Sequence, residues 1–146
     1  MEDHIFFGHI INDEPFEIVQ EMFIDVIRMN TVKNNNKLLN IACSSKKHRI
    51  VKWMLSISDN YNIKESEYFI LINALSISSV ETVKILFDTF DLSRFPYIIP
   101  TLQLIVENND IHMIKLFLKS YVVPDGFDVE IQNIFISACL HNKLFE

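Results

Sequence analysis

The apolar positions of the chain follow a pattern that returns every 31 to 33 residues. In each copy, a first apolar segment is followed by a polar turn and then by a second apolar segment. Apolar residues in the second segment recur at the spacing of one side of an α-helix, as in IVKWML at 50–55. The pattern therefore predicts pairs of short helices. The copies align on one residue each: Ile10, Ala42, Ala74, Ile105 and Ala138.

The predicted second helices also repeat at single positions. Nine residues after the alignment residue, four copies hold a β-branched side chain: Val19, Val51, Val83 and Ile114. The next position is polar in the same copies: Gln20, Lys52, Lys84 and Lys115. One helix pair of this size buries too little apolar surface to be stable alone, so we expect the copies to stack. The predicted fold is all-α, a single α-solenoid of helix-turn-helix repeats over 1–146. Its repeats are placed at 5–37, 38–66, 67–100, 101–130 and, in truncated form, 131–146.

Longer segments separate the predicted helix pairs, at 24–37, 56–66, 88–100 and 119–133. They contain residues that favour turns, such as the three asparagines at 34–36 and the Pro-Asp-Gly sequence at 124–126. We expect these connectors to protrude along one edge of the stack.

Composition and charge indicate a helical, acidic, intracellular protein. The chain has 2 glycines and 4 prolines, fewer than an all-β fold with many tight turns requires. Its net charge of −6 gives no electrostatic reason to bind nucleic acid or an anionic membrane. The first residues are acidic where a signal peptide is basic, and no apolar run is long enough to cross a membrane. We therefore expect neither a nucleic-acid nor a membrane partner.

No residue pattern points to an active site, a metal or a cofactor. Cys43 and Cys139 are too far apart for a paired metal motif, and we expect both to be structural thiols. The five histidines lack the spacing of a helical zinc motif. One basic cluster at 46–52 precedes Trp53, but Trp53 falls in an apolar column and is predicted to join the core. We expect a protein that is not an enzyme.

The second copy resembles an ankyrin repeat. It reads LLNIACSSKKHRIVKWMLSISDNYNI at 38–63. Ala42 and Cys43 match the small pair of the ankyrin first helix, and Ile50 to Lys52 match the Ile-Val-Lys of the second. The residues of this copy, such as Ile-Val-Lys-Trp-Met-Leu, are similar to those of ankyrin proteins from amoeba-infecting giant viruses. The abundance of amino acids with AT-rich codons is similar as well.

The other copies depart further from the ankyrin pattern. None has the Thr-Pro-Leu-His opening, and Ile10 and Ile105 stand where ankyrins have alanine. The glycine of the ankyrin turn is replaced by other residues: Lys46, Ser78, Asn109 and Asn142.

The resemblance implies a non-enzymatic module that binds a partner protein through a concave face of first helices, turns and connector tips. If the source is viral, it implies the host cytoplasm as the location. The implied contact residues in the turns are Asp13, Ser45, Lys46, Lys47, Asn108, Asn109 and Asp110. Those at the connector tips are Asn34, Lys64, Glu65, Arg94, Tyr97 and Phe127.

A second interpretation starts from the shortened last copy. We expect this copy to leave Ile134, Ile136 and Leu140 without a second helix of their own repeat to cover them. The alternative function is a structural or assembly protein that associates with itself through this incomplete C-terminal repeat. The identity of the partner, the oligomeric state and whether the gene is a degenerate copy stay open at this point.

Overall fold

The computed structural model describes residues 3–77, 79–108 and 111–120. Over these residues the secondary structure is entirely helical, which confirms the predicted all-α class. The helices are α1 (Asp3–Asp13), α2 (Phe16–Met29), α3 (Val32–Ser44), α4 (His48–Ile57), α5 (Glu65–Ser76), α6 (Val80–Thr89), α7 (Ile98–Glu107) and α8 (Ile111–Ser120). The predicted contact residues Asn109, Asp110 and Phe127 and the predicted repeat at 131–146 lie outside the described residues.

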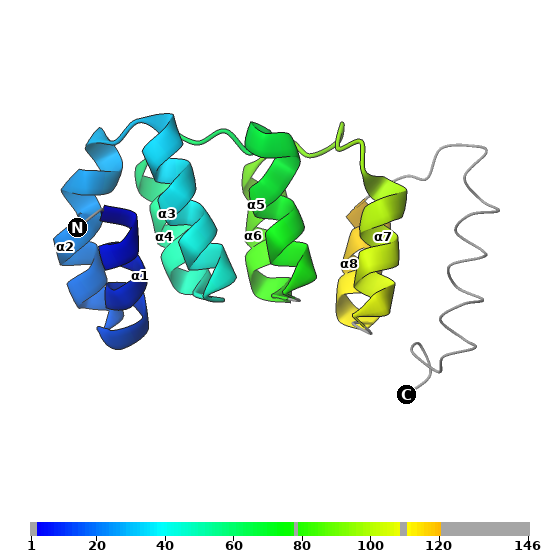
Figure 1. Cartoon of the computed structure of the whole chain (residues 1–146), viewed down its shortest axis with the longest axis horizontal. Coiled ribbons are helices and arrows are strands. Elements are labelled where there is room, and N and C mark those ends of the chain that lie inside the picture. Colours follow the sequence, from blue (N-terminus) through cyan, green and yellow to red (C-terminus); the bar gives the residue numbers. More distant parts are fainter. Residues whose placement is uncertain (1–2, 78, 109–110, 121–146) are drawn as a thin grey trace.

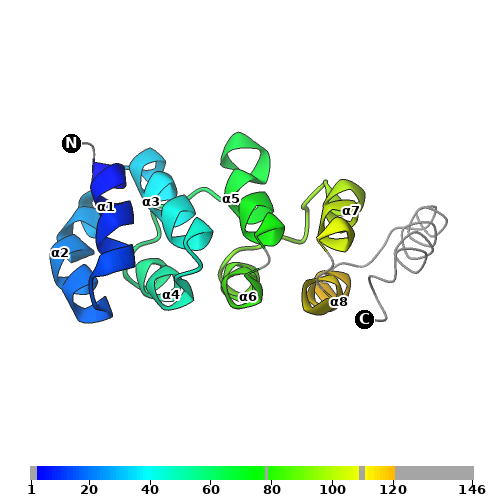
Figure 2. The same cartoon turned by 60° about the horizontal axis from the view of Figure 1, so that its bottom comes forward.

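The described helices form two rows (Figure 1). Each odd-numbered helix packs against the even-numbered helix that follows it. Each helix also packs against the next helix of its own row, as α3 does against α1 and α5. Figure 2 shows the odd-numbered row, α1, α3, α5 and α7, lying above the even-numbered row, α2, α4, α6 and α8.

One apolar core runs between the two rows, from Phe7 in α1 to Phe117 in α8. Each helix contributes a stripe of residues spaced by three or four positions, such as Val19, Phe23 and Ile27 in α2. Ala42, Ala74 and Ile105 are buried in it, and Ile10 packs against it. Trp53 is half-buried and its ring lies 6.2 Å from that of Phe16, so it joins the edge of the core as predicted.

The predicted connector at 24–37 is wrong. α2 continues to Met29 and α3 begins at Val32, so two residues separate the helices. The side chain of Thr31 caps α3 by accepting a hydrogen bond from the backbone N–H of Asn34, at 3.2 Å. Asn35 and Asn36 are buried inside α3, not exposed in a turn. The other described connectors, 58–64 and 90–97, lie on the same edge as residues 30–31 (Figure 1).

The turn between α3 and α4 holds Lys46 in the left-handed region, with φ at 57°. This conformation favours glycine because a side chain crowds the backbone there. We expect Lys46→Gly to raise the free energy of unfolding by about 0.5–1 kcal/mol, measured by urea denaturation. Ser45, whose φ is −86°, provides the control: Ser45→Gly is expected to leave stability unchanged or to lower it. A stability equal to that of the parent for Lys46→Gly would contradict the prediction.

Candidate functional site

A cleft of about 200 Å³ lies between α3 and α5 in the odd-numbered row. We call it the α3–α5 cleft. Its most exposed apolar group is Phe69, which is 49% accessible to solvent. Its other lining residues are mostly polar: Asn36, Lys37, Asn40, Glu65, Ser66 and Ile70.

Asn36 fixes one wall of the α3–α5 cleft. This side chain is buried, and its Nδ2 donates hydrogen bonds to the backbone oxygen of Asn62 and to Oε2 of Glu65, both at 2.9 Å. Its Oδ1 accepts a third bond from the backbone N–H of Asn62, at 3.1 Å. Asn36 therefore ties the connector before α5, and the start of α5 itself, to α3.

The first turn of α5 has a left-handed backbone. Ser66, Glu67 and Tyr68 have φ values of 53°, 57° and 63°. This conformation costs about 1–2 kcal/mol for each residue with a side chain. Strain of this kind persists only where the surrounding structure holds it in place, and it is concentrated at functional sites.

Aromatic packing holds the left-handed turn. The buried ring of Tyr68 meets that of Phe95 edge-on, with centroids 5.1 Å apart. It also meets the ring of Tyr97 at 6.5 Å, and Phe95 and Tyr97 pack against each other at 5.7 Å. The turn places Glu65 beside Asn36 and Phe69 at the opening of the cleft.

Polar side chains connect neighbouring helices of the odd-numbered row. Nδ2 of Asn73 in α5 donates to Oδ1 of Asn40 in α3, at 3.2 Å. Nδ2 of Asn108, which follows α7, donates to the backbone oxygen of Ser76 at 2.9 Å. These amides are occupied in holding the row together, which leaves Lys37, Glu65 and Phe69 as the long, exposed side chains of the cleft.

The structure places the predicted contact residues in different surroundings. Of these residues, Glu65 lines the α3–α5 cleft, and Lys64 precedes it. Seven are exposed: Asp13, Asn34, Lys46, Lys64, Glu65, Arg94 and Asn108. Three are half-buried: Ser45, Lys47 and Tyr97.

Two of the predicted connector tips do not lie as expected. Asn34 stands in the first turn of α3, because Thr31 caps that helix earlier than the sequence pattern indicated. Tyr97 is the residue before α7, and its ring is half-buried against Tyr68 and Phe95. Tyr97 therefore supports the strained turn and presents only part of its surface to solvent.

The sequence-based prediction missed Phe69 and Asn36. Phe69 occupies the position that Lys37 and Pro100 occupy in the neighbouring copies, so the repeat itself does not require an apolar residue there. A large apolar residue at a position that the repeat does not require to be apolar was the signal that could have identified Phe69. Asn36 gave none, because a run of asparagines is typical of a turn.

The surroundings of Cys43 and Asp91 shift the pKa values of these two ionisable side chains. Burial raises the pKa of the Cys43 thiol to about 12, so the thiol stays protonated at neutral pH, as expected for a structural cysteine. The side chain and backbone N–H of Ser93 donate to Oδ1 of Asp91, and these bonds lower its pKa. The described residues contain no group of three or more His, Cys, Asp or Glu side chains arranged to hold a metal ion.

None of the described helices is both long enough and apolar enough to cross a membrane. Comparison with protein-family models, with curated proteins and with solved structures gave no match to the chain.

Proposed function

We propose that this chain is a non-enzymatic protein-binding module with an ankyrin-like solenoid fold, and that the odd-numbered row carries its binding surface. The repeat of 31 to 33 residues, the likeness of 38–63 to an ankyrin repeat and the two rows of stacked helices support the fold. A stack of this kind is already folded before it binds, so binding a partner costs it little conformational entropy. The location in a host cytoplasm belongs to the same proposal.

The observation that carries the proposed function is the setting of Phe69. Aromatic side chains contribute a large share of the binding energy at protein interfaces, especially where neighbouring contacts exclude water. Phe69 is half exposed, and the left-handed turn before it is held by the buried ring of Tyr68. The chain therefore keeps an apolar anchor at a fixed place in a cleft that polar side chains also line.

The size of the α3–α5 cleft favours a protein partner over a small molecule. Small-molecule sites measure about 300–1,000 Å³. This cleft is smaller, at about 200 Å³, and it presents the amine of Lys37 and the carboxylate of Glu65 around Phe69. It suits one apolar side chain of a partner, with hydrogen bonds and charge contacts at its rim.

We expect Phe69→Ala to weaken binding of the partner at least about tenfold, as for an aromatic hot spot, and to change stability little because the ring is half exposed. The measurement is a quantitative pull-down from amoebal lysate, the source that the resemblance suggests, with the intact chain as bait. Met22→Ala is the matched control, because Met22 is 41% exposed and lies on α2 in the other row.

A protein recovered by the parent and by Met22→Ala, but lost with Phe69→Ala, would support the cleft as the binding surface. Recovery that is unaffected by Phe69→Ala would remove the cleft from the proposal. Self-association through 131–146 stays a prediction, since those residues lie outside the described part of the chain. Light scattering during size-exclusion chromatography tests it.

A further inference from the structure

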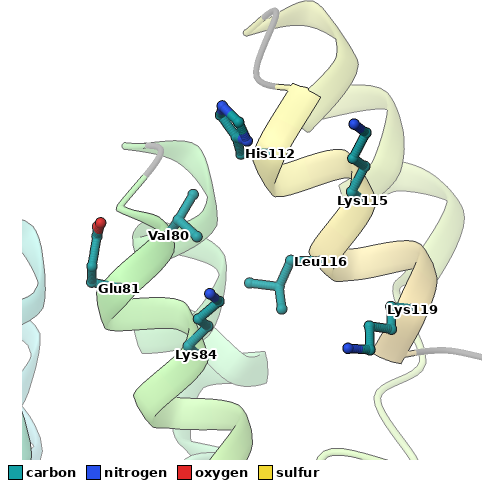
Figure 3. Close-up of a pocket in the computed structure, with 7 residues that line it drawn as sticks. All are labelled: Val80, Glu81, Lys84, His112, Lys115, Leu116 and Lys119. Carbon is teal, nitrogen blue, oxygen red and sulfur yellow. The ribbon is translucent and has the colours of Figure 1, made fainter.

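A groove of about 680 Å³ lies in the even-numbered row, between α6 and α8 (Figure 3). We call it the α6–α8 groove. It belongs to the opposite row from the α3–α5 cleft (Figure 2). Its lining residues are Val80, Glu81, Lys84, His112, Lys115, Leu116 and Lys119.

The basic side chains of the groove come from one side of α8 and from α6. His112, Lys115 and Lys119 are spaced by three and four residues, so they lie on one side of their helix. The sequence of α8, Ile111–Ser120, contains no carboxylate. Lys84 and Lys119 extend into the space between the two helices, whereas the carboxylate of Glu81 points away from α8 (Figure 3).

The groove is a positively charged region of an acidic protein. It holds three lysines and one glutamate, while the whole chain has a net charge of −6. Lys115 and Lys119 are one helical turn apart, a like-charge arrangement that is slightly destabilising. Among the described residues, no carboxylate forms an ion pair with Lys84, Lys115 or Lys119. A bound group carrying negative charge would relieve this repulsion.

Apolar side chains accompany the lysines. Val80 and Leu116 are half-buried and line the groove from α6 and α8. A ligand that matches the groove therefore carries carboxylates together with apolar groups. We propose that the α6–α8 groove binds an acidic peptide segment of another protein, with its carboxylates facing the three lysines and an apolar side chain on Val80 and Leu116. This second binding site goes beyond the function proposed for the odd-numbered row.

At its α2 end, the even-numbered row favours a short peptide over a long nucleic acid, although α4, the neighbour of α6, exposes Arg49 and Lys52. α2 lies in the same row and exposes Glu17, Glu21 and Asp25, which would repel a long polyanion running along it. Proteins that bind single strands also present aromatic rings on which bases stack, and the lining of the groove contains no Phe, Tyr or Trp.

The test uses a fluorescein-labelled peptide of alternating Glu and Leu residues, titrated with the full chain and followed by fluorescence anisotropy. We expect saturable binding that weakens as salt rises from ~50 to ~300 mM, since the contacts are exposed charges. Lys84→Glu combined with Lys119→Glu is expected to weaken binding at least about tenfold. Lys119→Gln, which removes one charge without reversing it, is expected to give a smaller loss.

The matched control is Lys33→Glu combined with Lys64→Glu. Both lysines are exposed, one in α3 and one just before α5, and the change in net charge is the same. This control and Phe69→Ala should bind the peptide as the parent does, which separates this test from that of the α3–α5 cleft.

Four results would overturn the proposal. The first is the absence of saturable binding up to about 1 mM peptide. The second is equal binding of a peptide with Gln in place of each Glu, and the third is equal binding by the double lysine variant of the groove. The fourth is displacement of the peptide by a single-stranded oligonucleotide at equal charge concentration, which would assign the groove to polyanions in general.

Discussion

Ile105→Ala is expected to lower the free energy of unfolding by about 2–5 kcal/mol, because the change removes three buried carbons and leaves a cavity. Ile105 is 1% exposed and lies in α7 at the alignment residue of its repeat. Urea denaturation followed by circular dichroism measures the loss. Leu104→Ala is the control, since Leu104 is adjacent but half-buried and should cost less.

The reverse change tests the same column in the neighbouring repeat. Ala74 is 0% exposed in α5, and Ala74→Ile is expected to cost about 1–3 kcal/mol by overpacking. The two losses together would show that each repeat is packed for its own side chain at this position. If both variants unfolded with the parent, the alignment of the repeats on these residues would be wrong.

Asn36→Ala is expected to lower the free energy of unfolding by about 1–3 kcal/mol. The variant loses three hydrogen bonds and leaves backbone groups of Asn62 without their partner in α3. Asn34→Ala is the control, because Asn34 lies two positions earlier in the same helix and is exposed. Its free energy of unfolding should stay within about 0.5 kcal/mol of that of the parent. Thermal denaturation of the two variants side by side makes the comparison, and equal losses would contradict the role assigned to Asn36.

Asn36→Ala is also expected to raise amide hydrogen exchange in the connector 58–64. Asn36 joins that segment to α3 through both the N–H and the carbonyl of Asn62, so its loss frees the segment locally. Exchange that rises equally in the connector 90–97, which has no bond to Asn36, would point to general destabilisation instead.

Elements whose buried stripe is visible in the local sequence could be predicted. The apolar spacing of 50–55 gave α4, and the same spacing elsewhere gave the helix pairs and the all-α class. The start of α3 could not be predicted in this way. Asn35 and Asn36 are polar, and their burial depends on partners 8 to 29 positions away along the chain: Ile27, Ser58, Asn62 and Glu65. A local reading of three asparagines favours a turn.

The candidate site was predicted only at its border. The resemblance to an ankyrin repeat implied Lys64 and Glu65 as contact residues at a connector tip, and the structure places Glu65 in the lining of the cleft with Lys64 just before it. Phe69 was missed because its position depends on the left-handed turn at 66–68. That turn is held by the contact of Tyr68 with Phe95, which lies 27 residues further along the chain, so no local pattern predicts it.

The two rows of helices also determine how far local unfolding extends along the chain. The main contacts of each described helix reach its own pair and the adjacent pair. Contacts of such short range form without closing long loops, so the chain is expected to fold quickly and from more than one starting point. They also allow one part of the stack to unfold while the rest stays folded. A destabilising substitution between α5 and α7 would open that junction, while amide protons two pairs away, in α1 and α2, would stay protected from hydrogen exchange.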